Sequence, residues 1–159
     1  MSNTNTDVSA IAILNDAREY YRATEQLFRS KPRLSRPLNA FYFHTVELAL
    51  KAYLRTHGRH RWGHGIGALY NECRALGLKI SHDDPYGLAN IVSLLESGNE
   101  DMGFRYFNLK SVSEPDLLWT REVVGQLMEA VEAFVDPEGP RAPGVAVKFM
   151  MVIGKPTSQ

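Results

Sequence analysis

The sequence has a single cysteine, Cys73, among its 159 residues. One cysteine excludes a disulfide within the chain and a metal site built from several thiolates. It also suits a reducing compartment, so we expect the protein in the cytoplasm. The sequence lacks any long uncharged apolar run, and its first ten residues are mostly polar. This pattern predicts neither a signal peptide nor a membrane-spanning helix.

The chain has no excess of either charge, because 18 Lys and Arg residues balance 18 Asp and Glu residues. A neutral protein has no global field to attract polyanions, so a nucleic-acid role would need a local basic patch. The charges are unevenly distributed along the chain. The stretch from Lys51 to His64 holds only basic charged residues, whereas residues 114–138 hold many acids and the single arginine Arg121.

Regularly spaced apolar residues predict two long helices in the first part of the chain. Steps of three or four residues predict one helix over Asp7–Ser30 and another from about Leu38 to His57. The second is apolar around most of its surface, so we expect it at the centre of a bundle. Between them, Pro32 and Pro37 disfavour helical geometry in the residues before them and predict an extended connector.

Three more apolar stripes predict three further helices, and Gly58 and Gly77 are the expected stop signals after the second and third. Asp83 or Asp84, followed by Pro85, is the expected start of the fourth helix. The three helices are predicted over residues 66–76, from Asp83 or Asp84 to residues 97–99, and from Ser113 and Pro115 to residue 135.

The composition changes after Asp136. A connector rich in proline and glycine, PEGPRAPG, precedes the apolar stretch VAVKFMMVI, which has strand propensity. One short strand cannot form a sheet alone, so this tail packs along the bundle, pairs with a second copy of the chain, or is disordered. We therefore predict an all-α, five-helix, up-and-down bundle over residues 1–136 and a flexible C-terminal segment over residues 137–159.

Three segments together resemble the HEPN family of small all-helical domains. The central helix reads AFYFHTVELALKAYLRTHG, the next helix GHGIGALYNECRALGL, and a later loop FRYF. The resemblance covers roughly Asp7–Asp136, and the order of the segments carries more information than any one of them. The matching positions are Glu47, Leu50, Lys51 and Ala52 on the central helix, then His64, Ile66 and Leu69.

This resemblance implies a helical bundle, usually dimeric, that handles RNA or nucleotides. Many HEPN members are metal-independent ribonucleases, or toxins paired with a nucleotidyltransferase. Their signature is an arginine followed a few residues later by a histidine, which can deprotonate a ribose 2′-hydroxyl while the arginine stabilises the phosphate. Arg105 has the family's position but no histidine follows it in range, whereas Arg59 and His64 have the spacing at an earlier turn. The catalytic candidates are Arg59, His64 and Arg105.

The basic stretch LRTHGRHRWGH, residues 54–64, is the candidate nucleic-acid-binding segment. Guanidinium groups match phosphate oxygens, and a tryptophan offers a stacking face to an unpaired base. The same stretch could equally be a solvated turn, or bind an acidic surface such as the carboxylates Glu122, Glu129 and Glu132 of a second copy. Its histidines have no nearby Cys, Asp or Glu, so we expect no metal and no cofactor. The candidate nucleic-acid-binding residues are Arg55, Arg59, Arg61 and Trp62.

A polar seam formed by His44, Glu47 and Lys51 interrupts the apolar surface of the central helix. Glu47 and Lys51 are four residues apart, a spacing that favours a modest ion pair of about 0.3–0.5 kcal/mol when exposed. The seam either lines a pocket or a dimer groove, or is simply the wet edge of a buried helix.

The leading functional hypothesis is a binding module for RNA or nucleotides, non-catalytic or weakly catalytic, within a toxin–antitoxin or defence system. The chain is expected to form a homodimer. One alternative is a metal-independent endoribonuclease that uses Arg59 or Arg105 with His64. Another is a protein-interaction scaffold that recruits a protein partner through its helical faces and C-terminal tail.

Overall fold

The computed structural model describes residues 8–30, 34–82, 86–100 and 113–141 of the chain. Within these ranges the backbone forms helices and no strands. The prediction of an all-α domain with five helices is confirmed. In chain order the helices are α1 (Ala10–Arg29), α2 (Ser35–Thr56), α3 (Ile66–Ala75), α4 (Leu88–Asn99) and α5 (Leu117–Val135).

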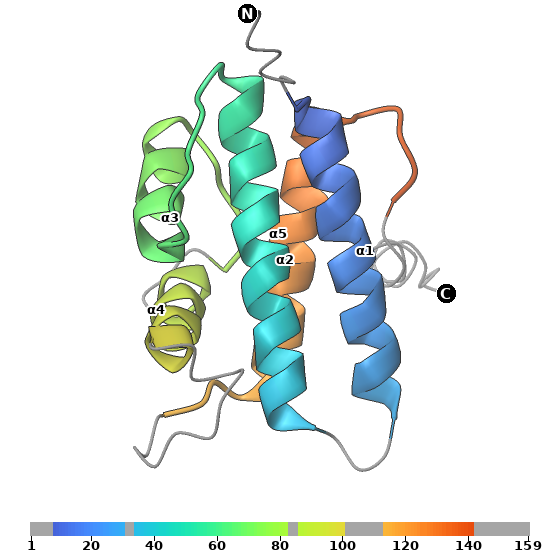
Figure 1. Cartoon of the computed structure of the whole chain (residues 1–159), viewed down its shortest axis with the longest axis vertical. Coiled ribbons are helices and arrows are strands. Elements are labelled where there is room, and N and C mark those ends of the chain that lie inside the picture. The colour runs from blue at the N-terminus through green and yellow to red at the C-terminus, as the bar shows by residue number, and fades with distance from the viewer. Residues whose placement is uncertain (1–7, 31–33, 83–85, 101–112, 142–159) are drawn as a thin grey trace, which may run out of the picture.

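The helices pack as an up-and-down bundle around α2, which contacts each of the others (Figure 1). Helix α1 runs along one side of α2. Helices α3 and α4 lie one above the other along the opposite side of α2, and α5 lies behind it. Leu38, Leu50 and Leu54 of α2 have no exposed surface. A helix that is apolar around most of its surface can bury that surface only in the centre of a bundle, as predicted.

Helix boundaries follow local capping more closely than the apolar pattern indicates. Ser9 caps α1 by accepting a hydrogen bond from the Ala12 amide at 3.1 Å, so the helix begins three residues after Asp7. Asp116 caps α5 by accepting a 2.8 Å hydrogen bond from the Trp119 amide. The cap lies one residue after Pro115, where the helix was predicted to open. Gly58 and Gly77 follow α2 and α3 with positive φ angles, as a helix stop requires.

Two predicted helix starts were wrong. Helix α2 begins at Ser35, so Pro37 lies in its first turn and not in the extended connector. A proline is tolerated there because the amides of a first turn have no partner within the helix. Helix α4 begins at Leu88, with Gly87 before it, and not at Asp83 or Asp84. A Cβ on Gly87 would lie 1.8 Å from the carbonyl oxygen of His82, so only glycine fits this entry to the helix.

Charged side chains are buried between α1 and α5. Arg18 donates from Nε to Glu132 at 3.0 Å, and from Nη1 to Asp136 at 3.0 Å. Glu132 is fully buried. The expectation that Glu132 belongs to an exposed acidic surface was therefore wrong: its carboxylate is used inside the bundle to join the last helix to the first.

Arg105 and the loop predicted around it lie outside the described residues, and so does most of the predicted tail. Helix α5 ends at Val135, and the proposed division into residues 1–136 and 137–159 stays a prediction. Among the described residues no helix combines the length and the apolar character needed to cross a membrane.

Candidate functional site

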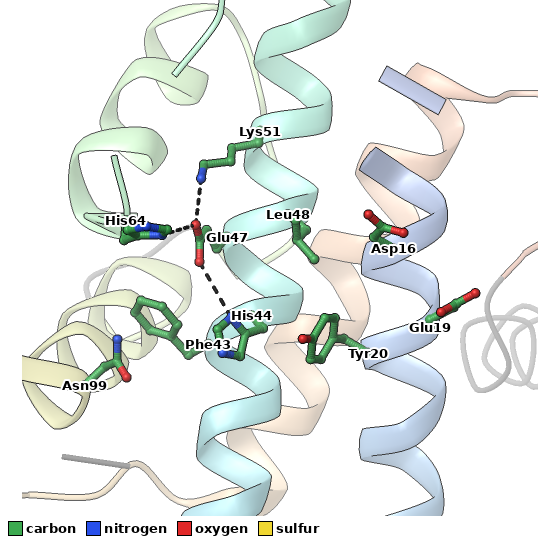
Figure 2. A pocket seen from close by; sticks show the side chains of 10 residues that line it. All are labelled: Asp16, Glu19, Tyr20, Phe43, His44, Glu47, Leu48, Lys51, His64 and Asn99. Carbon is green, nitrogen blue, oxygen red and sulfur yellow. Dashed lines mark hydrogen bonds and ion pairs between the residues drawn. The ribbon is translucent and has the colours of Figure 1, made fainter. Parts of the chain in front are cut away.

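A cavity of about 590 Å³ opens on the face of the bundle where α1, α2, α4 and the segment before α3 meet (Figure 2). Helix α2 contributes the polar seam, and His64 reaches the same cavity from the segment that enters α3. The structure thus brings His44, Glu47, Lys51 and His64 together. The lining residues are Asp16, Glu19, Tyr20, Phe43, His44, Glu47, Leu48, Lys51, His64 and Asn99.

Glu47 is the centre of this cluster. Its Oε1 accepts hydrogen bonds from Lys51 Nζ at 2.7 Å and from His64 Nδ1 at 2.8 Å, while His44 Nδ1 lies 3.7 Å from Oε2 (Figure 2). The Glu47 side chain is 6% exposed, whereas that of His64 is 81% exposed. One buried carboxylate therefore orients three basic side chains that come from one helix and the turn that follows it.

The environment keeps Glu47 ionised. Burial, the largest single effect, acts to raise the pKa of Glu47, but the hydrogen bonds from His44, Lys51 and His64 together outweigh it and lower this pKa from 4.5 to about 2. Glu47 is consequently an anion at physiological pH. An imidazole that donates from Nδ1 to a carboxylate has, in its neutral form, its lone pair on Nε2.

Aromatic rings surround His44 on the floor of the cavity. The Tyr20 ring centroid lies 5.1 Å from that of His44, and the Phe43 ring stands edge-on at 5.7 Å. Tyr20 comes from α1, so this contact also joins α1 to the seam on α2 (Figure 2). These contacts restrict the orientation of the His44 imidazole.

The basic stretch after α2 is held by an acid from another helix. Glu72 of α3 accepts from Arg59 Nη1 at 2.8 Å and from Arg61 Nε at 2.6 Å. These hydrogen bonds lower the pKa of Glu72, and the bond from Arg61 has the largest effect. Arg55 contacts the ring of His60. Two of the three arginines that the sequence places in an acid-free stretch, Arg59 and Arg61, therefore share one carboxylate in the fold.

Trp62 is exposed beside these arginines, with 81% of its surface accessible. It borders a second cavity of about 470 Å³, next to Arg61 and Glu72. A large exposed indole beside guanidinium groups is unusual for a structural residue, because a tryptophan normally contributes its area to a core.

A family model of the HEPN domain matches residues 11–139. The chain belongs to the HEPN domain family. No curated protein and no solved structure matches it. Nucleotide- and RNA-related roles are known for HEPN domains, which often bind RNA and dimerise. The resemblance read from the central helix and the helix after it is therefore confirmed.

The catalytic candidates of this HEPN domain are placed in two separate contacts. Arg59 binds Glu72 on α3, whereas His64 binds Glu47 on α2, so different carboxylates orient the two side chains. Arg105 lies outside the described residues. In the part of the chain that the structure describes, no three His, Cys, Asp or Glu side chains gather as a metal-binding group.

Sequence reasoning missed several residues at both sites of the HEPN domain. Glu19 and Tyr20 follow Asp16 by three and four residues, and this spacing places both near Asp16 on one face of α1, so the polar face could have been recognised. Glu72 and Asn99 gave no such signal, because their roles depend on where a turn and a distant helix lie. The missed residues are Asp16, Glu19, Tyr20, Glu72 and Asn99.

Proposed function

We propose that this HEPN domain is an RNA-binding module that holds single-stranded RNA on the last turn of α2 and the stretch that follows it. The residues proposed to contact RNA are Arg55, Arg59, Arg61 and Trp62. The nucleotide- and RNA-related roles of the family support the proposal. The observation that carries it is the exposed Trp62 beside the half-exposed Arg59 and Arg61.

The chemistry of these side chains suits an unpaired strand. A base can stack on the indole of Trp62, which is worth about 1–3 kcal/mol for a base on an aromatic side chain. The guanidinium groups of Arg59 and Arg61 can bind the flanking phosphates with paired N–H donors. Because the chain has no net charge, this local patch supplies the attraction that the whole protein lacks.

Replacing Arg55, Arg59 and Arg61 with alanine is expected to weaken binding of a single-stranded RNA by roughly tenfold to a hundredfold. Each phosphate contact on a single strand contributes about 0.7 to the slope of log affinity against log salt, so the slope should become shallower by about 2. The measurement is a salt titration followed by fluorescence anisotropy of a labelled RNA.

The matched control replaces Arg22, Arg29 and Arg141, which are exposed arginines outside the stretch, with alanine. It removes the same charge and should leave most of the affinity and the slope unchanged. If both triple variants bind RNA as the unmodified protein does, the proposed surface is not the one that binds.

A second candidate function, metal-independent endoribonuclease, is favoured by the bond between His64 and Glu47. With Nδ1 held by Glu47, Nε2 of the exposed His64 could take the proton of a ribose 2′-hydroxyl as that oxygen attacks the phosphorus. The bond from phosphorus to the 5′-oxygen would break, and that oxygen would take a proton from water, leaving a 2′,3′-cyclic phosphate. Arg105 and Arg59 stay the candidates for stabilising the phosphate in this hypothesis.

The endoribonuclease hypothesis predicts RNA cleavage that persists in the presence of a chelator. Replacing His64 with alanine should lower the rate about a hundredfold, because general base catalysis typically contributes a factor of this order. His64 is largely exposed, so circular dichroism should show an unchanged helix content. Undiminished cleavage by the His64→Ala variant, or cleavage abolished by the chelator, would exclude this mechanism.

We further propose that the protein forms a homodimer and acts in the cytoplasm within a toxin–antitoxin or defence system. The tendency of HEPN domains to dimerise supports the homodimer. The scaffold alternative assigns recruitment of a protein partner to the helical faces and the tail after Asp136. Measuring the oligomeric state of a chain that ends at Asp136 separates a tail that joins two chains from one that does not.

A further inference from the structure

Glu72 has an unusual position within the proposed RNA-binding surface. Its carboxylate binds both Arg59 and Arg61, and its side chain is 14% exposed beside guanidinium groups that are about half exposed. Two positive charges therefore share one negative charge, and the group as a whole has a net charge of one. An RNA phosphate that approaches Arg59 or Arg61 meets this carboxylate as an internal competitor.

The bonds to Glu72 leave each arginine able to bind a phosphate. Arg59 donates through Nη1, so Glu72 does not use the edge formed by its Nε and Nη2. Arg61 donates through Nε, so Glu72 does not use the edge formed by its Nη1 and Nη2. Each of these edges carries two parallel donors, the arrangement that binds a phosphate most strongly. Glu72 thus lowers the net charge of the group while holding two usable edges in fixed directions.

This combination affects duplex and single-stranded RNA differently. A duplex offers the higher density of phosphates but keeps its bases stacked and paired, so it can gain little from Trp62. Its binding would depend on net positive charge, which Glu72 reduces. An unpaired strand can add stacking on Trp62 to phosphate contacts, so it loses proportionally less from the reduced charge.

We propose that Glu72 is a specificity-determining residue that makes this surface select unpaired RNA over duplex RNA. The inference rests on the proposed function, since it assumes that RNA binds at Arg59, Arg61 and Trp62. In this role Glu72 disfavours duplex RNA. A carboxylate among phosphate-binding groups weakens purely electrostatic binding, so a ligand must add other contacts, such as stacking on Trp62, to bind well.

The test compares the Glu72→Gln variant with the unmodified protein on a single-stranded RNA and on a duplex of the same sequence. Fluorescence anisotropy over a range of salt gives both affinities. We expect the variant to bind the duplex about fivefold more tightly, because an exposed charge of this kind contributes on that order. The single strand should gain less than about twofold, because its lower density of phosphates gains less from the removal of a negative charge. The preference for the single strand therefore falls.

Two controls make the result specific. Glu129→Gln removes the same charge on α5, a helix that makes no contact with α3 among the described residues, and should leave the preference unchanged. Trp62→Ala should weaken binding of the single-stranded RNA and leave binding of the duplex unchanged. Thermal unfolding of each variant checks that the bundle is retained.

The outcomes separate the inference from the proposed function. The inference fails if Glu72→Gln leaves the preference for the single strand unchanged or increases it. The proposed function still stands in that case, provided that the triple arginine variant binds RNA more weakly than the unmodified protein. A Glu72→Gln variant that binds both forms more weakly also overturns the inference, because Glu72 then serves only to position the arginines. Binding that is indifferent to the triple arginine change removes the proposed function itself.

Discussion

Replacing Arg18 with methionine should lower the free energy of unfolding by about 3–5 kcal/mol, as expected when one partner of a buried ion pair is removed. Arg18 lies 3.0 Å from Glu132 through Nε, with side-chain exposures of 7% and 0%. Methionine has no donor, so a fully buried carboxylate would lose the cation that compensates its desolvation. Urea denaturation at neutral pH measures the loss, which is a large share of the stability of a typical domain.

The matched variant replaces both members of the Arg18–Glu132 pair, with Arg18→Met and Glu132→Leu together. Removing the second charge should recover most of the lost stability, because an apolar pair of similar size has no desolvation cost. Arg29→Met tests an exposed arginine, 4.0 Å from Glu25, and should cost less than about 1 kcal/mol. A double variant that is less stable than Arg18→Met alone would mean that packing around Arg18, and not the loss of the cation beside Glu132, sets the cost.

The apolar period predicts the helices of this HEPN domain because burial in a bundle follows position on the helix. Leu14, Tyr21 and Phe28 are spaced seven residues apart, which places them on one stripe of α1, and all three are buried. The same stripe includes Val8 and Ile11, which are about half exposed because they lie at the very start of the helix and before it. Periodicity thus predicts which face is buried, but not where the bundle stops covering it.

Glu132 shows why residue type is a weaker guide than position. It follows Met128 by four residues, so helical spacing places it on the buried stripe of α5, although its charge suggested the surface. Phe134 follows Val131 by three residues, a spacing that also predicts the buried stripe, yet it is 45% exposed. The partner that allows Glu132 to be buried is 114 residues away in the chain, and no local pattern indicates such a pair.

The two sites differ in how much the sequence could predict. The bond between Glu47 and Lys51 follows from their spacing on α2, since residues four apart are neighbours on a helix. The bond from His64 to Glu47 and those from Arg59 and Arg61 to Glu72 depend on the path of the turn between α2 and α3. A turn of this length has many conformations of similar local energy, so its contacts required the fold.

Replacing Glu47 with glutamine should lower the free energy of unfolding by about 3 kcal/mol at neutral pH, and the difference should shrink in acid. The pKa of Glu47 is about 2 in the folded chain, against 4.5 for an ordinary glutamate. Each pH unit between these values corresponds to about 1.4 kcal/mol. Because the folded pKa is the lower one, the stabilisation is fully present above pH 4.5 and is lost as the pH falls through about 2.

Urea denaturation of both proteins at several pH values measures this dependence. The difference between the unmodified protein and Glu47→Gln should fall from about 3 kcal/mol at pH 7 to about 1 kcal/mol at pH 3. Glu129→Gln, which removes an equal charge on α5, corrects for the general effect of net charge in acid. A difference that stays constant from pH 7 to pH 3 would show that the hydrogen bonds from Lys51 and His64 do not favour the ionised form of Glu47. The role of Glu47 in orienting His64 would then have to rest on packing alone.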